Sequence, residues 1–175
     1  MGRLRPPFPR DARDTAPMGT WDARRAGVVT LPDGRRVRGR GLRDGTTTVG
    51  DHAPELGLYL TAREHREAGW ESWWIRWPDF RLPHSTPDAL VALRDAFERA
   101  ATTRVEIACN GGTGRTGTAI AVLARYAGLP AEDAVTWVRT SYRAGAVETP
   151  GQRRLVRNAS LKPRSGTEEA PPHGP

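Results

Sequence analysis

Short apolar runs alternate with longer stretches of helical periodicity along most of the chain. Residues 55–62 (ELGLYLTA), 70–77 (WESWWIRW) and 103–109 (TRVEIAC) are rich in apolar, aromatic and β-branched side chains, so each predicts a strand. Upstream, AGVVTL and RRVRGR flank Asp33-Gly34, a pair typical of a hairpin turn. The first half of the chain is therefore predicted to be mostly strands.

Helical spacing dominates the second half of the chain. The predicted helices are residues 86–101, the apolar stretch that ends at Gly128 and Pro130, residues 131–142 and residues 148–159. Thr86 and Thr149 are the expected caps of the first and last helices. The second is expected to be amphipathic, with Ile120 and Leu123 on its apolar face.

Strands that alternate with helices predict a single-domain α/β fold with a central, mostly parallel sheet flanked by helices. Residues 21–160 would form this domain. The segments 1–20 and 161–175 are rich in Pro and charged residues and have no apolar period, so we expect them to be poorly ordered tails. In such sheets, sites form beyond the carboxyl ends of the strands.

The net charge of +7 lies mainly at the two ends of the chain. Residues 1–25 hold six arginines and three aspartates, and residues 153–175 hold five basic residues and two glutamates. The central body is close to neutral. Because nucleic-acid binding needs a basic stripe on a folded element, we do not expect a nucleic-acid partner.

The chain has one cysteine, Cys109, so it can form no internal disulfide. A lone thiol suits a reducing compartment, and no apolar stretch has the length of a membrane span. We therefore expect a cytoplasmic protein with no membrane contact. The four histidines are scattered and no ligand cluster is visible, so neither a metal nor another cofactor is expected.

A glycine-rich segment follows the strand predicted at 103–109. Its residues are Cys109, Asn110, Gly111, Gly112, Thr113, Gly114, Arg115 and Thr116. If this segment wraps tightly, its amide N–H groups form an anion nest beside a helix N-terminus, and the guanidinium of Arg115 can hold two phosphate oxygens.

A cysteine at the base of such a nest lies where helix dipole and cation favour the thiolate, and the Thr116 hydroxyl could hydrogen-bond its sulfur. Two other interpretations exist. Cys109 could be inert packing, or the turn could bind a nucleotide; the nucleotide loop, however, requires a lysine that is missing here.

The spacing Cys-x5-Arg-Thr resembles the signature of the cysteine-based protein tyrosine phosphatases. Residues 77–80, Trp-Pro-Asp-Phe, resemble the mobile WPD loop of that family, which carries its general acid. Residues 145–152, GAVETPGQ, resemble the loop that orients the hydrolytic water, in the version found in small atypical dual-specificity phosphatases. The resemblance covers roughly residues 55–158.

The resemblance implies a protein tyrosine phosphatase-like fold and a two-step reaction through a phosphocysteine. Cys109 would be the nucleophile, Arg115 would hold the phosphate together with residues 110–114, and Asp79 would be the proton donor. The substrate would be a phosphorylated protein or peptide, and phosphate, sulfate or vanadate would bind in the loop.

The resemblance also implies roles for residues of the loops at 77–80 and 145–152. Gln152 would position the water, and Trp77 and Pro78 would set the loop that carries the acid. Glu148 could act with Gln152 on water or simply begin the helix. Closure of the loop at 77–80 would bring its acid to the phosphate.

Two residues depart from the family pattern, and one of them is Glu148, which stands where classical tyrosine-specific members place Gln. Ala108 stands where the family usually has His, which puts the rigidity of the loop in question and leaves a phosphopeptide-binding pseudophosphatase as an alternative. A second alternative is an enzyme for other esters, such as inositides or RNA 5′ ends. The short chain favours a shallow, dual-specificity pocket.

Overall fold

The computed structural model describes residues 19–45 and 53–159. The strands are β1 (Val28–Thr30), β2 (Arg36–Gly41), β3 (Leu56–Thr61), β4 (Glu71–Arg76) and β5 (Val105–Cys109). The helices are α1 (Thr86–Arg99), α2 (Gly114–Tyr126), α3 (Ala134–Ser141) and α4 (Pro150–Asn158), and a short 3-10 helix spans Leu42–Asp44. The predicted tails fall almost entirely outside the described residues.

The five strands form one sheet in the order β1-β2-β5-β3-β4. The neighbours β2 and β5, β5 and β3, and β3 and β4 run parallel, and only the hairpin partner β1 runs antiparallel. The predicted α/β class with a mostly parallel sheet is confirmed. The hairpin turns through Gly34, whose φ of +90° suits glycine.

Strand β3 is buried along its whole length. It lies between β5 and β4, and strands inside a parallel sheet are covered on both faces, which favours a nearly continuous apolar sequence. Strand β2 lies nearer the edge, and its residues alternate between buried and half-buried. The strand order places β5, and the segment that follows it, at the centre of the sheet.

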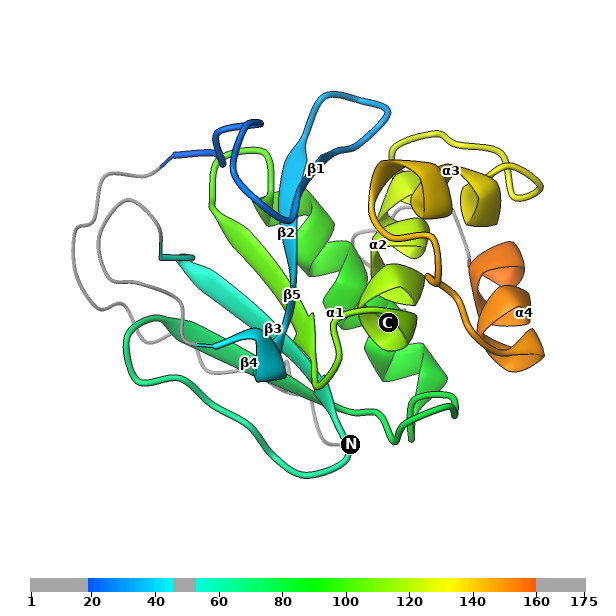
Figure 1. Cartoon of the computed structure of the whole chain (residues 1–175), viewed down its shortest axis with the longest axis horizontal. Coiled ribbons are helices and arrows are strands. Elements are labelled where there is room, and N and C mark those ends of the chain that lie inside the picture. The colour runs from blue at the N-terminus through cyan, green and yellow to red at the C-terminus, as the bar shows by residue number, and fades with distance from the viewer. Residues whose placement is uncertain (1–18, 46–52, 160–175) are drawn as a thin grey trace, which may run out of the picture.

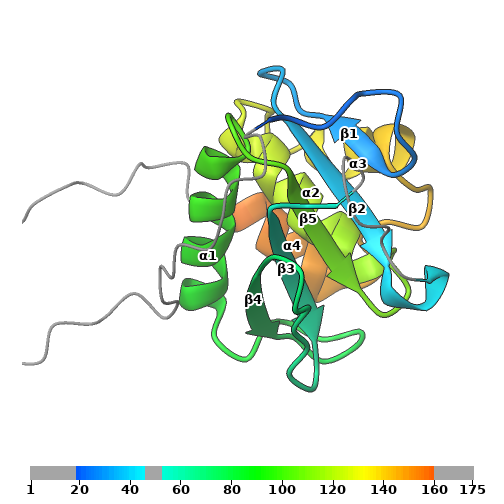
Figure 2. The ribbon, with the colours of Figure 1, turned by 90° about the vertical axis from the view of Figure 1, so that its left-hand side faces the viewer.

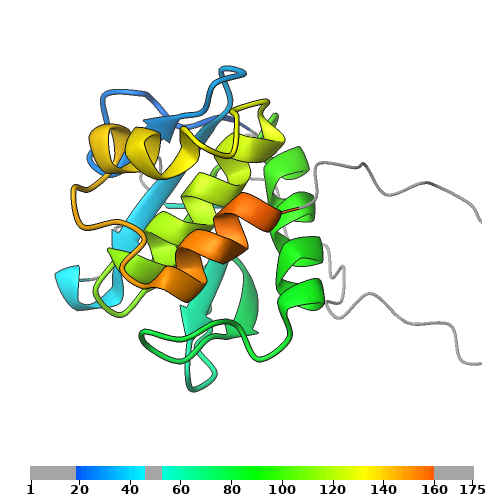
Figure 3. The ribbon, with the colours of Figure 1, turned by 90° about the vertical axis from the view of Figure 1, so that its right-hand side faces the viewer.

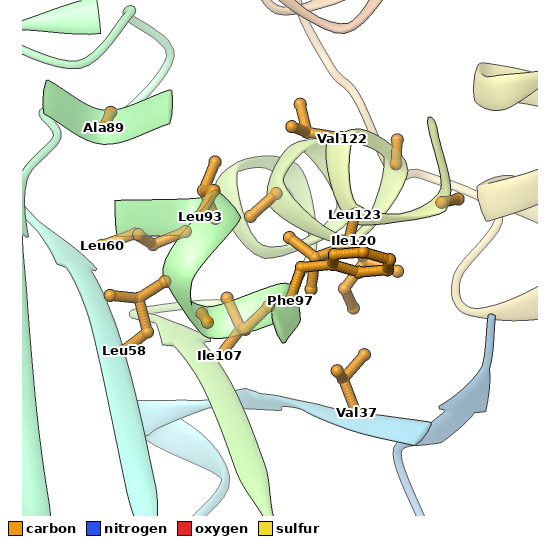
Figure 4. Close-up of a cluster of buried hydrophobic side chains, with 14 of the residues drawn as sticks. Val37, Leu58, Leu60, Ala89, Leu93, Phe97, Ile107, Ile120, Val122 and Leu123 are labelled. Carbon is orange, nitrogen blue, oxygen red and sulfur yellow. The ribbon is translucent and has the colours of Figure 1, made fainter. Parts of the chain in front are cut away.

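The four helices lie on one face of the sheet (Figures 1 and 3), and among the described residues no helix covers the other face (Figure 2). The core fills the space between the sheet and helices α1 and α2 (Figure 4). Its members include Val37, Leu58, Leu60, Leu93, Phe97, Ile107, Ile120 and Leu123.

Helix α2 is not amphipathic as predicted. Every residue from Gly114 to Arg125 is buried. The sheet covers one side of the helix, and α3 and α4 cover the outer side (Figure 3). Its small residues, such as Ala119 and Ala121, permit this close packing, and a helix buried all round need not have a polar face. The start of α2 is thereby fixed at the centre of the domain.

The cap predicted for α4 is confirmed, and the cap predicted for α1 is wrong by one residue. Thr149 caps α4, as predicted, by accepting a hydrogen bond from the backbone N–H of Gln152. The cap of α1 is Ser85 rather than Thr86, because the Ser85 hydroxyl accepts from the N–H of Asp88. None of the helices in the described ranges combines the length and the apolar character needed to cross a membrane.

The face of the sheet without helices holds a buried charge cluster. Glu106 of β5 is fully buried and pairs with Arg38 and Arg40 of the adjacent strand β2, at 2.5 and 3.0 Å. Arg38 also lies over the ring of the buried Trp21, 4.0 Å from its centre. A buried carboxylate needs such partners, since an uncompensated charge inside a protein is costly.

We therefore predict that Glu106→Ala lowers the free energy of unfolding by about 3–5 kcal/mol, because it removes the buried carboxylate that both guanidinium groups share. Glu64→Ala is the matched control, since Glu64 pairs with Arg66 at the surface and its loss should change stability little. Urea unfolding measures both variants. Equal losses for the two would contradict the importance of the buried cluster.

Candidate active site

The candidate site forms where parallel strands end at one edge of the sheet. Cys109 is the last residue of β5, and the peptide after Arg76, the last residue of β4, leads to Trp77. We call residues 109–116 the cysteine loop. Cys109 is 2% exposed, and its Sγ accepts a hydrogen bond from the Gly112 N–H at 3.2 Å. The loop therefore curls back over the sulfur, as an anion nest requires.

The curl of the cysteine loop depends on Gly112. Its φ is +67°, and a Cβ built there would lie 2.4 Å from the backbone nitrogen of Gly41 at the end of β2. Only glycine permits both the left-handed conformation and this approach. By contrast, Gly111 has open space around it. The loop is thus packed directly against a neighbouring strand end.

Arg115 joins the cysteine loop to the Trp77–Phe80 segment. Its side chain is 2% exposed; Nη1 donates to the Trp77 carbonyl at 2.9 Å, and Nη2 lies 3.2 Å from Oδ1 of Asp79. Its Nε is buried and has no partner among the described residues. The structure thus brings together the predicted phosphate-binding and acid residues, and one guanidinium N–H remains available to a ligand.

The Trp77–Phe80 segment has a buried anchor and an exposed tip. Trp77 is fully buried; its backbone N–H donates to Thr61 and its indole N–H to the Arg81 carbonyl. The side chain of Asp79 is 51% exposed, and Phe80 is 62% exposed with φ at +55°. Trp77 therefore fixes the base of the segment while the carboxylate stands at the mouth of the site.

Gln152 takes part in the cap of α4. Its Oε1 accepts hydrogen bonds from the N–H groups of Glu148 and Thr149, at 2.8 and 3.3 Å. The side chain is fully buried, and Nε2 has no partner among the described residues. The Oε1 of the side-chain amide is thus fixed, while its N–H groups donate to no atom in the described residues.

Glu148 lies one residue before the cap Thr149, so it precedes α4 rather than beginning it. Its carboxylate lies against Gly114 at the start of α2, where a Cβ would be only 1.8 Å from Oε2. Burial raises the pKa of Glu148, the charge of Asp79 raises it further, and Arg115 opposes the shift. Glu148, Asp79 and Arg115 therefore form one electrostatic group.

Two other residues that the sequence analysis singled out lie in α2 and in β5. Thr116 is fully buried, and its Oγ1 has no partner among the described residues. Ala108 is also fully buried, and in the sheet it is in register with Arg40 and Tyr59. The position that the family fills with His is thus enclosed by two large side chains.

Sequence reasoning missed two residues that contact the cysteine loop. Tyr142 donates its hydroxyl to the Gly112 carbonyl, and Arg143 donates to the Gly111 carbonyl at 2.9 Å. Both follow α3, and they are 30 and 32 residues away in the chain from the glycines whose carbonyls they bind. The only signal in the sequence was their position just before the GAVETPGQ segment. Among the described residues, no group of three His, Cys, Asp or Glu side chains could hold a metal ion.

Comparison with known proteins decides the family. The family model described as protein-tyrosine phosphatase matches residues 53–162, from just before β3 to just beyond α4. The chain belongs to the protein-tyrosine phosphatase family. It is accordingly a phosphatase, and the match includes the cysteine loop, the Trp77–Phe80 segment and Gln152.

Solved structures agree with this family. A crystal structure of Tk-PTP in the active form has 28% sequence identity and a TM-score of 0.59, and the match covers 74% of this chain and 93% of that chain. A glycine-to-alanine mutant form of Tk-PTP has 30% identity and a TM-score of 0.52, with coverages of 59% and 75%. No curated protein matches the sequence.

The packing of Gly112 gives a prediction for this phosphatase. Gly112→Ala should weaken vanadate binding by roughly 10-fold or more, because the added Cβ displaces the loop amides from the nest. Gly128→Ala is the matched control: Gly128 has φ at +98° but open space around it, so strain is introduced without a clash. Vanadate inhibition constants measure the difference, and equal constants would contradict the role of the close approach.

Proposed function

We propose that this protein removes phosphate from phosphotyrosine in proteins, and from phosphoserine and phosphothreonine as well, through a phosphocysteine intermediate. The observation that carries the proposal is the buried Arg115, which lies in the loop that curls over Cys109 and also contacts Asp79. The residues proposed as nucleophile, phosphate-binding cation and acid thus lie at the same edge of the sheet. Substrates would be phosphorylated proteins or peptides.

In the first step, the Cys109 thiolate attacks phosphorus, and the bond from phosphorus to the ester oxygen breaks. Asp79 transfers its proton to that oxygen, which leaves as an alcohol or a phenol. Arg115 and the loop amides at residues 110–114 hold the equatorial oxygens as their charge develops. Because the Arg115 Nε has no partner within residues 19–45 and 53–159, it can donate to phosphate without breaking a hydrogen bond to that part of the chain.

In the second step, water attacks the phosphocysteine, Asp79 accepts a proton from the water, and the thiolate leaves. The Thr116 hydroxyl is buried, has no hydrogen-bond partner in the described part of the chain, and would donate to the departing sulfur. Gln152 would position the water through its Nε2, which has no partner in the part of the chain that the structure describes, while its Oε1 remains in the α4 cap. Glu148 carries a raised pKa next to Asp79 and would share in orienting this water.

The surroundings of the site support aryl phosphates as preferred substrates. Phe80 is exposed next to Asp79, where an aromatic leaving group would pack against it. Trp77 and Pro78 would set the reach of the segment. A cytoplasmic location suits the reaction, because the thiol must stay reduced. Phosphate, sulfate and vanadate are the expected small ligands of the loop.

The first test compares hydrolysis of para-nitrophenyl phosphate and of a phosphotyrosine peptide in the presence of a chelator. Cys109→Ser should abolish both activities. Asp79→Asn should lower kcat by roughly 100-fold or more on the peptide and by less on the nitrophenyl ester, whose leaving oxygen needs less protonation. Asp133→Asn, an exposed acid before α3, is the control and should leave both rates unchanged.

Other outcomes of that test separate the alternatives. Faster turnover of an inositide or an RNA 5′ phosphate than of any phosphopeptide would replace the protein substrate. Phosphopeptide binding without turnover by the wild type would make the protein a pseudophosphatase, with Ala108 as the first position to restore. Equal rates for Asp79→Asn and wild type on the peptide would remove Asp79 from the proton-donor role.

Gln152 allows a second test that separates its two parts. Gln152→Glu keeps an acceptor for the α4 cap but loses the N–H donor, whereas Gln152→Ala loses both. We predict a pre-steady-state burst of nitrophenol in both variants, because the second step becomes slower than the first. Gln152→Ala should also lower the melting temperature, by the loss of a cap worth about 1 kcal/mol. No burst in Gln152→Glu would contradict the water-positioning role.

A further inference from the structure

The outer side of the cysteine loop is held by hydrogen bonds from two segments far away in the sequence. The Gly111 carbonyl accepts from Nη1 of Arg143 at 2.9 Å, and the Gly112 carbonyl accepts from the hydroxyl of Tyr142. The Asn110 carbonyl accepts from the backbone N–H of Arg43 at 3.1 Å. Three successive loop carbonyls are thus fixed pointing away from the sulfur.

Fixing these carbonyls also fixes the amides of the nest. In a trans peptide, the C=O and the following N–H point in opposite directions. The peptide whose carbonyl binds Arg143 is therefore the one whose N–H, that of Gly112, donates to Sγ of Cys109 at 3.2 Å. By the same geometry, the bond from Tyr142 to the Gly112 carbonyl turns the N–H of Thr113 away from Tyr142 and toward the nest.

Tyr142 is itself held in place by the sheet. Its ring lies so close to Gly39 of β2 that a Cβ on Gly39 would be 2.5 Å from the ring carbons. Burial is the main cause that raises the pKa of the Tyr142 hydroxyl, so it stays protonated and able to donate at neutral pH. A buried, neutral hydroxyl of fixed position is well suited to bind a carbonyl.

Arg143 connects the cysteine loop to the end of β2. Its Nη2 lies 3.2 Å from Oδ2 of Asp44, and the same carboxylate oxygen accepts the N–H of Gly41 at 3.2 Å. Nη1 also approaches Oγ1 of Thr113 at 3.4 Å. The guanidinium therefore bridges two backbone segments, which an ammonium with a single point of charge does poorly.

We propose that Tyr142 and Arg143, which we call the loop clamp, are positioning residues that keep the cysteine loop in its anion-binding form. They touch neither the sulfur nor the expected phosphate, and they act by orienting the amides that do. The proposal rests on the proposed function only for the nature of the natural ligand, because any tetrahedral oxyanion would use the same amides.

The test measures anion binding without turnover. Vanadate protects Cys109, the sole cysteine, from alkylation by iodoacetamide, and the protection curve gives its dissociation constant. We expect Tyr142→Phe and Arg143→Gln each to raise this constant about 3- to 10-fold, as the loss of one hydrogen bond to the loop would. The alkylation rate at pH 7 without vanadate should also fall.

Three further variants separate the clamp from stability and from charge. Tyr126→Phe removes a comparable hydroxyl, which donates to the Leu90 carbonyl at 3.3 Å on another part of the fold, and should leave vanadate binding unchanged. Arg154→Gln removes an exposed arginine of α4 and should do the same. Arg143→Lys keeps the charge but cannot bridge Gly111 and Asp44, so it should bind vanadate as weakly as Arg143→Gln.

Each outcome bears on the proposal. If Tyr142→Phe behaves as Tyr126→Phe does, or if Arg143→Lys restores wild-type affinity, the clamp is wrong. If the wild type binds no vanadate, the clamp and the proposed function both fall. If the wild type hydrolyses no phosphate ester but the clamp variants still lose vanadate affinity, the proposed function fails and the clamp stands.

Discussion

The guanidinium of Arg115 is almost completely buried, and a buried charge must find partners. It finds them 38 residues earlier in the chain, at the Trp77 carbonyl and near the Asp79 carboxylate. This interaction couples the helix that follows the cysteine loop to the segment that carries the acid. The position of Asp79 relative to the cysteine loop therefore depends on Arg115 as well as on its own segment.

The same interaction implies an exchange of partners during catalysis. In the free protein, Asp79 lies 3.2 Å from the guanidinium that would bind phosphate. In the proposed mechanism, the oxygens of an incoming phosphate would compete with Asp79 for Arg115, and the protonated Asp79 side chain would be free to turn toward the leaving oxygen. Burial raises the pKa of the neighbouring Glu148, and the negative charge of Asp79 raises it further. Arg115 is the group that balances this negative charge.

The burial of α2 explains why the site is assembled from distant segments. Because α3 and α4 cover the outer side of α2, the connection between them passes along the cysteine loop and brings Tyr142 and Arg143 to it. Gly117 packs against Ala146 so closely that a Cβ would be 2.4 Å from the Ala146 Cβ. A small residue on the helix thus sets the distance from that connection to the phosphate site.

Much of the fold followed from local patterns in the sequence. The strands, the hairpin at Asp33-Gly34 and the Thr149 cap depend on short-range propensities, and they agree with the structure. The cysteine loop was visible because its glycines and Arg115 are adjacent in the chain.

Features that depend on tertiary packing were missed or wrong. The amphipathic prediction for α2 failed because periodicity cannot show how many neighbours a helix has. The cap of α1 shifted to Ser85 because two adjacent hydroxyl residues compete for one position. The contacts of Tyr142 and Arg143 join residues that only the folded chain brings together, and no local pattern predicts them.

The most direct test of this account is to identify the residue that receives the phosphoryl group. Wild-type protein quenched in acid during turnover of para-nitrophenyl phosphate would be digested and examined by mass spectrometry. The account predicts that the peptide containing Cys109 gains the mass of one phosphoryl group, with larger amounts in Gln152→Glu. Product formation with Cys109 unmodified, or with phosphate on another side chain, would contradict it.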